Sequence, residues 1–316
     1  MRPPPIPALL FGTLAISSAA VLIVLSGLPP EAIAVWRLGT TALVFAPFAA
    51  RRLGAEIGAL TRRDVWALVA GGITFGLHFV WFPMGFERTS YESTVLLLVV
   101  QPVLAAILGA AFLDEAITPS MVASIAIALT GLVVLVWDDY RFEPAHLWGD
   151  AIVLASCVAI VTTRALARGL RQRLSFTTYV CSISALGATV ASFGLAWRHA
   201  RLWHSGASGS EWIALALLLL VPTLGGHTIF HYVLKYVRVF HVNLVILAEP
   251  VIAIWMKHAL APWFVTFRGS ALTRAHLAGA ALLFVGVAVG LVLQERDDRP
   301  ASERSATEIA VDEVMS

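Results

Sequence analysis

Long apolar runs, separated by short polar or charged segments, recur along the whole chain. A helix needs about 20 apolar residues to cross the hydrocarbon core of a bilayer, and ten runs come close to this length. The expected membrane-spanning helices cover residues 6–28, 31–50, 65–86, 90–113, 118–137, 148–168, 176–197, 212–234, 239–259 and 276–293. The pattern therefore predicts an all-α integral membrane protein with ten transmembrane helices.

The composition supports a surface that faces lipid. Hydrophobic residues make up 59% and charged residues 13% of the 316 residues, and the mean hydropathy is +0.82. A soluble domain carries about 25% charged residues. The net charge of +2 gives no reason to expect a nucleic-acid partner. Cys157 and Cys181 lie in apolar runs, so we expect buried free thiols and no disulfide framework.

One pair of motifs occurs twice. Thr-Phe-Gly-Leu-His ends at His78 and Val-Val-Gln-Pro ends at Pro102; Thr-Leu-Gly-Gly-His ends at His227 and Leu-Ala-Glu-Pro ends at Pro250. The two histidines are 149 residues apart and the two prolines 148. Five spans is an odd number, so the second half must enter the membrane inverted relative to the first. This arrangement places a substrate site between the halves near the bilayer midplane.

The expected organisation is therefore two inverted five-helix repeats and a tail. The first repeat covers residues 1–140, the second 146–293, and a disordered cytoplasmic tail 294–316, because that last stretch is rich in Glu, Asp, Ser and Arg without an apolar period.

Clusters of arginine predict the orientation. The two richest are Arg51, Arg52, Arg62 and Arg63, and Arg164, Arg168, Arg171 and Arg173. Both flank cytoplasmic loops if the N-terminus is cytoplasmic, as the positive-inside rule requires. With ten spans the C-terminus lies on the same side. Because arginine outnumbers lysine, which is typical of GC-rich bacteria, we expect a bacterial cytoplasmic (inner) membrane.

An ordered set of residues across these spans resembles the drug/metabolite transporter superfamily, and within it the EamA-type transporters. The set comprises Arg37, Gly76-Leu77-His78, Gln101-Pro102, Leu113-Asp114-Glu115 and Gly131, then Gly149-Asp150, Gly225-Gly226-His227, Glu249-Pro250 and Gly286. The resemblance covers roughly residues 6–293, and its specificity lies in the order of the set. It implies a ten-helix fold and the transport, commonly export, of small metabolites such as amino acids.

The second half departs from this family pattern. Where the family closes the helix with Leu-x-Glu, as at Glu115, the chain reads Ala261-Pro262-Trp263. We expect an enlarged outward-facing loop over residues 261–276, which holds Arg268 and Arg274.

Glu249 is the sharpest candidate for function. An acid at the centre of a span costs roughly 2.5–3.5 kcal/mol on insertion scales. Pro250 removes a backbone donor and frees a carbonyl nearby, and Pro102 does the same beside Gln101. Such a site suits binding of a substrate ammonium or proton coupling. The alternative is that Glu249 and Gln101 only hold helices together by hydrogen bonds.

The remaining candidates are histidines and isolated polar or aromatic groups. His227 and His231 share a helix face, and His78 matches His227 in the first half; we expect them to line a polar cavity or relay protons. Zinc is a weaker alternative, because no acid lies between the two histidines, so we expect no metal or cofactor. Further candidates are Trp81 and Asn243, while Arg37 is expected to reach the outer surface, with anion binding as the alternative. Lys257 and His258 are expected to reach the headgroups.

No phosphate-binding Gly-x-x-x-x-Gly-Lys-Ser/Thr loop and no Gly-x-Ser-x-Gly motif occurs in the sequence. The leading interpretation is a secondary transporter, an exporter of a small polar or amphipathic metabolite, that works by alternating access. One alternative is a membrane enzyme for a lipid-linked substrate, although Asp138-Asp139 with Glu143 is the only notable acidic cluster. A small-molecule sensor is another. Expected partners are the substrate, membrane lipids and protons; a homodimer is left open.

Overall fold

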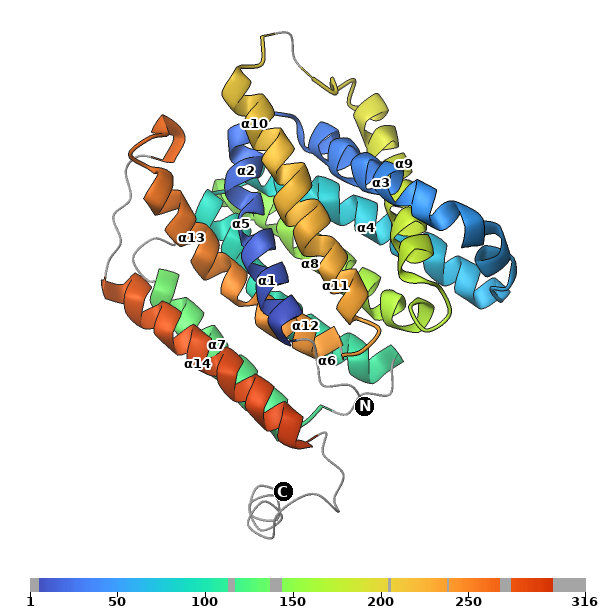
Figure 1. Ribbon diagram of the computed structural model, residues 1–316. Helices are drawn as coiled ribbons and strands as arrows, with labels where there is room; N and C mark the ends of the chain where they lie inside the picture. The colour runs from blue at the N-terminus through green and yellow to red at the C-terminus, as the bar shows by residue number, and fades with distance from the viewer. Residues whose placement is uncertain are drawn as a thin grey trace.

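The computed structural model describes residues 6–112, 117–136, 144–203, 206–237, 239–267 and 274–297. Every regular element in these ranges is helical (Figure 1). The first half contains α1 (Ile6–Ser17), α2 (Ala19–Ser26), α3 (Pro30–Gly58), α4 (Arg62–Arg88), α5 (Tyr91–Leu96), the 3₁₀ turn η1 (Leu97–Val100), α6 (Gln101–Phe112) and α7 (Pro119–Val136).

The second half begins with the short turn η2 (Pro144–His146). It continues with α8 (Leu147–Leu170), α9 (Phe176–Trp197), α10 (Gly209–Leu218), the wide π-helical stretch η3 (Leu219–His227), α11 (Thr228–Val233), α12 (Val239–Ile246), α13 (Ala248–Leu260), η4 (Val265–Phe267) and α14 (Arg274–Asp297).

The helices confirm a multi-pass membrane protein: within the described residues, eight helices are both long and apolar enough to span a membrane, and the predicted total of ten is not confirmed. The eight candidate spans are Pro7–Ser26, Pro30–Gly58, Arg62–Arg88, Tyr91–Phe112, Leu147–Leu170, Phe176–Trp197, Gly209–Val233 and Val239–Leu260. The predicted fifth and tenth spans are also helical: α7 has 18 residues and α14 has 24, and the apolar stretches described within them are Pro119–Val134 and Leu277–Gly290. Large apolar side chains such as Leu43 and Phe48 are exposed, as lipid contact requires.

Several sequence expectations fall on segments outside the described residues. These are the Leu113-Asp114-Glu115 turn, the acidic cluster Asp138-Asp139 with Glu143, Arg268 in the expected 261–276 loop, and the tail beyond residue 297. Helix α14 runs to Asp297, a few residues past the predicted start of the tail. Both cysteines are buried free thiols, as expected.

Side-chain caps define where two of the spans begin. Thr61 accepts a hydrogen bond from the backbone N–H of Asp64, and the Asp64 carboxylate accepts one from the backbone N–H of Thr61. Ser208 and Glu211 form the same reciprocal pair ahead of α10. Each pair satisfies backbone donors that the first helical turn leaves unpaired.

Helices α7 and α14 pack against each other as a pair at the side of the main bundle (Figure 1, lower left). A Cβ at Gly131 would lie 2.4 Å from the backbone nitrogen of Leu283, and one at Gly286 would lie 2.6 Å from that of Ala128. Only glycine permits this close approach, because backbone atoms cannot move aside as a flexible side chain can.

We therefore expect Gly131→Ala to destabilise the protein by about 1–3 kcal/mol through overpacking. Gly39→Ala in α3 is the matched control, since nothing lies within 4 Å of a Cβ there, and it should leave stability unchanged or slightly raised. Thermal unfolding of the two variants in detergent measures the difference. Equal melting temperatures would contradict the tight α7–α14 contact.

Polar contacts join the loops into two opposite groups. On the predicted cytoplasmic side, Arg173 pairs with Asp64 at 2.6 Å, and Gln172 Nε2 donates to the carbonyl of Lys235 at 2.9 Å. On the other side, Arg198 pairs with Glu31 at 2.8 Å. The loops thus lie in two groups at opposite ends of the bundle, as expected for spans that alternate in direction. Which group faces the cytoplasm stays a prediction.

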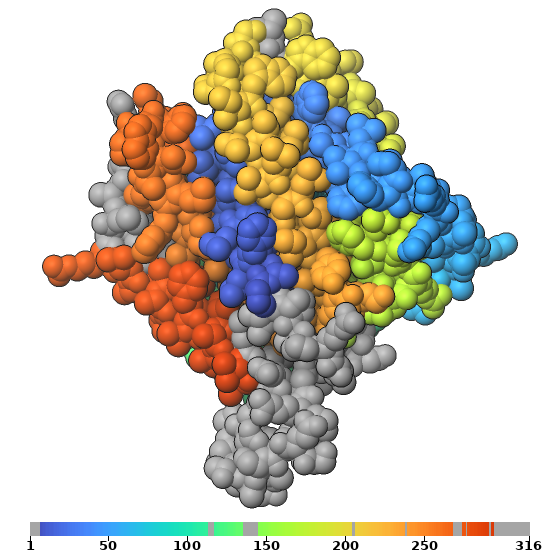
Figure 2. All heavy atoms as spheres, viewed as in Figure 1, coloured from blue at the N-terminus to red at the C-terminus, as the bar shows by residue number. Residues whose placement is uncertain are grey.

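The bundle is closed on the face that Figure 2 shows. There α1 and α2 (dark blue) lie between the α10–α11 arm (gold) and α13 (orange), and no opening leads inward between them. The contacts of α1 with η3 and α13 agree with this placement.

Candidate functional site

A small enclosed cavity lies at the centre of the bundle. Every candidate span except Phe176–Trp197 contributes to its wall, through Ile16, Ala19, Arg37, His78, Phe82, Leu98, Gln101, Arg164, His227 and Glu249. Its volume is about 20 Å³, which is room for about one water molecule. The cavity is polar and sits among membrane-spanning helices, where polar groups are costly and commonly functional.

The structure brings five predicted site residues to this cavity: Arg37, His78, Gln101, His227 and Glu249. The rings of His78 and His227 have centroids 6.3 Å apart. Residues from both halves of the chain therefore meet at one place, as the paired motifs predicted. What each residue does there stays a prediction.

His78 is held by the span opposite it. Its Nδ1 lies 2.8 Å from the Ser156 hydroxyl and 3.2 Å from the Ser156 carbonyl. Its ring stacks on Phe82, with centroids 5.9 Å apart. Helices α4 and α8 thus fix the orientation of the imidazole at the cavity wall.

Arg37 does not reach the outer surface, so that expectation is wrong. The residue is 2% exposed. Its Nε donates to Thr223 Oγ1 at 2.8 Å, and its guanidinium lies 4.3 Å from the centroid of the Phe79 ring. A hydrogen bond and a cation–π contact thus support the charge inside the bundle.

Thr223 is a residue that sequence reasoning placed in a motif without giving it a role. It lies in the π-helical stretch η3, and its Oγ1 also donates to the carbonyl of Leu218, five residues back, at 2.7 Å. The wide helical turn thereby positions the hydroxyl that holds Arg37. The repeated Thr-x-Gly-x-His motif was the available signal.

Arg164 is a cavity residue that sequence reasoning missed. The positive-inside pattern assigned it to a cytoplasmic cluster, but it is 4% exposed. Its Nη1 donates to Gln101 Oε1 at 2.6 Å and to Asn243 Oδ1. The signal was its spacing: it lies seven residues after Cys157, which is also buried, and hence on the same helix face.

Gln101 and Asn243 therefore share one hydrogen-bond donor, Arg164, which their positions in the sequence did not indicate. Gln101 belongs to the first half and Asn243 to the second, and one guanidinium bridges them. Asn243 is fully buried and its Nδ2 donates to the carbonyl of Val239 at 2.7 Å. Asn243 is not part of the cavity wall, but it holds Arg164, which is.

Glu249 lies at the cavity next to a break in its span. Helix α12 ends at Ile246 and α13 begins at Ala248. The corresponding span of the first half changes to a 3₁₀ turn over Leu97–Val100, just before Gln101 and Pro102. Each break lies about one turn before a proline, where the missing N–H leaves the helical ladder incomplete. Within the described residues, no Lys, Arg or His nitrogen lies within 4.0 Å of the Glu249 carboxylate.

Two predicted residues lie away from the cavity. His231 packs between Phe75 and Tyr179, at centroid distances of 5.0 and 5.4 Å. Trp81 is half-buried and packs against the apolar core. Position along the helix explains the first case, because His231 lies about 6 Å further along the axis than His227, on the same face but beyond the cavity.

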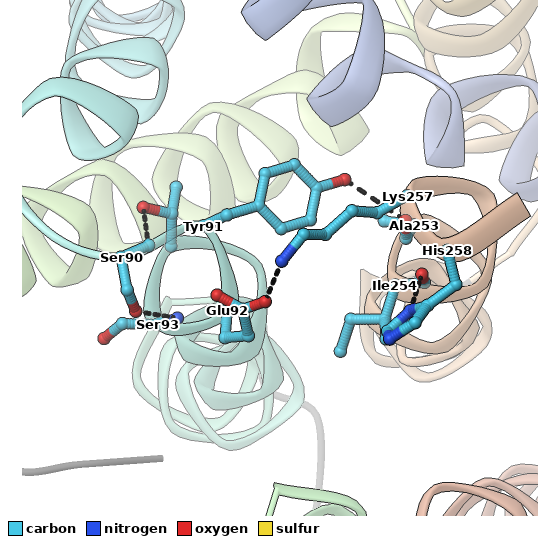
Figure 3. A network of polar contacts seen from close by, with 9 residues as sticks. Ser90, Tyr91, Glu92, Ser93, Ala253, Ile254, Lys257 and His258 are labelled. Carbon is cyan, nitrogen blue, oxygen red and sulfur yellow. Dashed lines mark hydrogen bonds and ion pairs between the residues drawn. The ribbon is translucent and has the colours of Figure 1, made fainter. Parts of the chain in front are cut away.

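A second polar network joins α5 and α13 away from the cavity (Figure 3). Lys257 forms an ion pair with Glu92 and lies 5.3 Å from the centroid of the Tyr91 ring. The Tyr91 hydroxyl donates to the carbonyl of Ala253 at 3.1 Å. Lys257 therefore does not extend to the headgroups, because Glu92 on the facing span neutralises it. The His258 ring instead lies 2.8 Å from the carbonyl of Ile254.

No group of three or more His, Cys, Asp or Glu side chains suited to a metal occurs in the described part of the chain. The two histidines of the cavity have one carboxylate near them, Glu249, and two arginines that would repel a cation. The zinc alternative gains no support from this geometry.

Comparison with known proteins supports a transporter. Residues 6–137 match the model of the EamA-like transporter family, which belongs to the drug/metabolite transporter superfamily. The resemblance noted in the sequence is thus confirmed for the first half. No curated protein matches the sequence. One solved structure, titled "Crystal structure of protein", has the same fold: the TM-score is 0.69 at 20% identity, over 93% of this chain and 99% of the other.

Proposed function

Because residues 6–137 belong to the EamA-like transporter family, we propose that the chain is a secondary transporter. It exports a small polar or amphipathic metabolite, such as an amino acid, by alternating access between two inverted repeats. In this proposal it resides in a bacterial cytoplasmic membrane with both termini in the cytoplasm. The observation that carries the proposal is the enclosed polar cavity to which both halves contribute side chains.

The packing of the helices supports a repeat relationship. If the first five spans correspond to the last five in order, α1 corresponds to α8 and α4 to the span that contains η3. The contact of α1 with η3 then corresponds to the contact of α8 with α4, and both contacts exist. The pairs α3–α9 and α7–α14 also pack together, and each pair maps onto itself.

The size of the cavity supports a mechanism with moving halves. About 20 Å³ cannot hold a metabolite, so substrate enters only after one side opens. Ion pairs join neighbouring segments on both sides of the bundle: Arg173 with Asp64 on one side and Lys257 with Glu92 on the other. The described conformation thus fits an occluded state between inward-open and outward-open ones.

Uptake into proteoliposomes tests the proposal. The panel includes neutral, acidic and basic amino acids, nucleosides, organic acids and amines, each with and without a pH gradient. We expect protein-dependent, saturable flux of at least one compound. Flux no greater than that of protein-free vesicles for every class would oppose transport.

The orientation is tested by single cysteines at exposed loop positions. Arg62→Cys and Gln172→Cys belong to the predicted cytoplasmic side, and Ser210→Cys to the opposite side. In intact cells a membrane-impermeant maleimide should label only Ser210→Cys, and all three should react after permeabilisation. Labelling of Arg62→Cys or Gln172→Cys from outside would reverse the topology.

A further inference from the structure

We propose that the central cavity selects small ligands with one net negative charge and that the Arg37 guanidinium receives their anionic group. The inference rests on the proposed transport function, because it names the class of substrate for the same cavity. It follows from the charges that line the cavity and from an unused hydrogen-bond donor of Arg37.

The cavity carries an excess of positive charge in every protonation state. Its wall contains two guanidinium groups, Arg37 and Arg164, and one carboxylate, Glu249. With His78 and His227 neutral the sum is +1. Protonation of either histidine or of Glu249 only adds positive charge. A monoanion brings the cavity to neutrality, a zwitterion leaves it positive and a cation raises its charge.

This net positive charge is unfavourable in free energy because the cavity is buried inside the bundle. A charge that is removed from water inside a bundle is costly unless it is paired. Arg37 is 2% exposed and Arg164 4% exposed, and neither has a carboxylate within 4.0 Å among the described residues. An entering anion would therefore gain a stronger electrostatic interaction here than at a solvated surface.

Arg37 is the guanidinium positioned to receive that anion. Thr223 holds its Nε and the Phe79 ring covers one face. Its Nη2 is buried and has no hydrogen-bond partner in the described part of the protein. An unpaired buried donor of this kind is uncommon. The planar fork of a guanidinium matches the paired oxygens of a carboxylate or phosphate.

Arg164 has a different role, because its Nη1 is already occupied. The amide oxygens of Gln101 and Asn243 both accept from it. It contributes charge to the cavity and links the two halves. The ligand's anionic oxygens are thus directed to Arg37, and the second arginine adds long-range attraction.

The shared chemistry is an anionic oxygen group, which a carboxylate or a phosphate can supply. The experiment compares lactate, glutamate, dimethyl phosphate (a phosphate monoanion), leucine and putrescine as ligands of the purified full-length protein. Binding is measured as a concentration-dependent rise in melting temperature in detergent, and flux of the same compounds is measured in proteoliposomes. We expect a rise with the carboxylate anions or with the phosphate, and none with leucine or putrescine at equal concentration.

Arg37→Gln should weaken apparent anion affinity about 10- to 100-fold, the effect of losing a charge-assisted hydrogen bond. Arg173→Gln is the matched control, because it removes one positive charge from an ion pair that is not part of the cavity wall, and it should bind like the wild type. If Arg37→Gln does not fold, Arg37→Lys retains the charge but lacks the fork and should still weaken binding. If neither variant folds, the comparison of the five ligands on the wild-type protein still tests the proposal.

A shift with leucine or putrescine alone, no shift with any anion, or unaltered anion binding by Arg37→Gln would each overturn the inference. Failure of the proposed function looks different. Anion binding without any flux would contradict transport and keep the anion site, whereas flux restricted to neutral or cationic compounds would keep transport and contradict the anion site.

Discussion

We expect Glu249→Gln to abolish gradient-driven flux while the protein still folds and inserts. The substitution keeps the size and hydrogen-bonding capacity of the side chain but removes its ionisable group. Glu249 lies at the central cavity beside the break between α12 and α13, and it has no close cationic partner among the described residues. A carboxylate so placed can take up and release a proton as access alternates.

The measurement is proton-gradient-driven flux in proteoliposomes, with insertion and melting temperature as controls. Glu211→Gln is a matched control, because Glu211 caps α10 and is not part of the cavity wall. We expect its flux to be normal and that of Glu249→Gln to fall to the level of protein-free vesicles. Normal flux by a well-folded Glu249→Gln would remove this carboxylate from the mechanism and make His227 and Gln101 the next candidates.

We expect Lys257→Gln to destabilise the protein, and the charge exchange Glu92→Lys with Lys257→Glu to restore much of the lost stability. The Glu92 side chain is 17% exposed and the Lys257 side chain 12% exposed, and the two form an ion pair between α5 and α13. Removing one partner leaves the other charge poorly solvated, which costs about 2 kcal/mol for a pair between the exposed and the fully buried case. The exchanged pair restores the attraction between the two spans.

A double-mutant cycle from thermal or denaturant unfolding measures this coupling. The singles Glu92→Lys and Lys257→Glu place like charges together, and each should be less stable than the double variant. Arg173→Gln, whose side chain is 55% exposed, should cost about 1 kcal/mol or less. Additive effects of the two exchanges would show that the pair does not join α5 to α13.

Much of the fold was readable from hydropathy, because a span in lipid must satisfy its backbone internally and so appears as a long apolar run. Within the described residues, eight of the ten expected spans are helices with the length and hydropathy of a membrane span, and α7 and α14 are helices at the other two predicted positions. Gly131 and Gly286 serve a close helix–helix contact, a feature that no hydropathy window registers.

The candidate site was predictable where the sequence repeats itself and unpredictable where it does not. The paired motifs located His78, Gln101, His227 and Glu249 at one cavity. Arg164 lies near a predicted cytoplasmic cluster, and its burial depends on acceptors contributed by two distant spans, Gln101 and Asn243. The same holds for Arg37, whose partner Thr223 lies 186 residues away. Such long-range pairs cannot be read from local spacing.

The most direct test of alternating access is the accessibility of a cavity residue from each side of the membrane. Ala19 lines the cavity and is small and apolar, so Ala19→Cys in a background without Cys157 and Cys181 reports access with little disturbance. A membrane-impermeant methanethiosulfonate reagent is applied to right-side-out and to inverted vesicles. The account predicts modification from both sides, each slowed by transported substrate. Modification from one side only, or from neither, would contradict transport through this cavity.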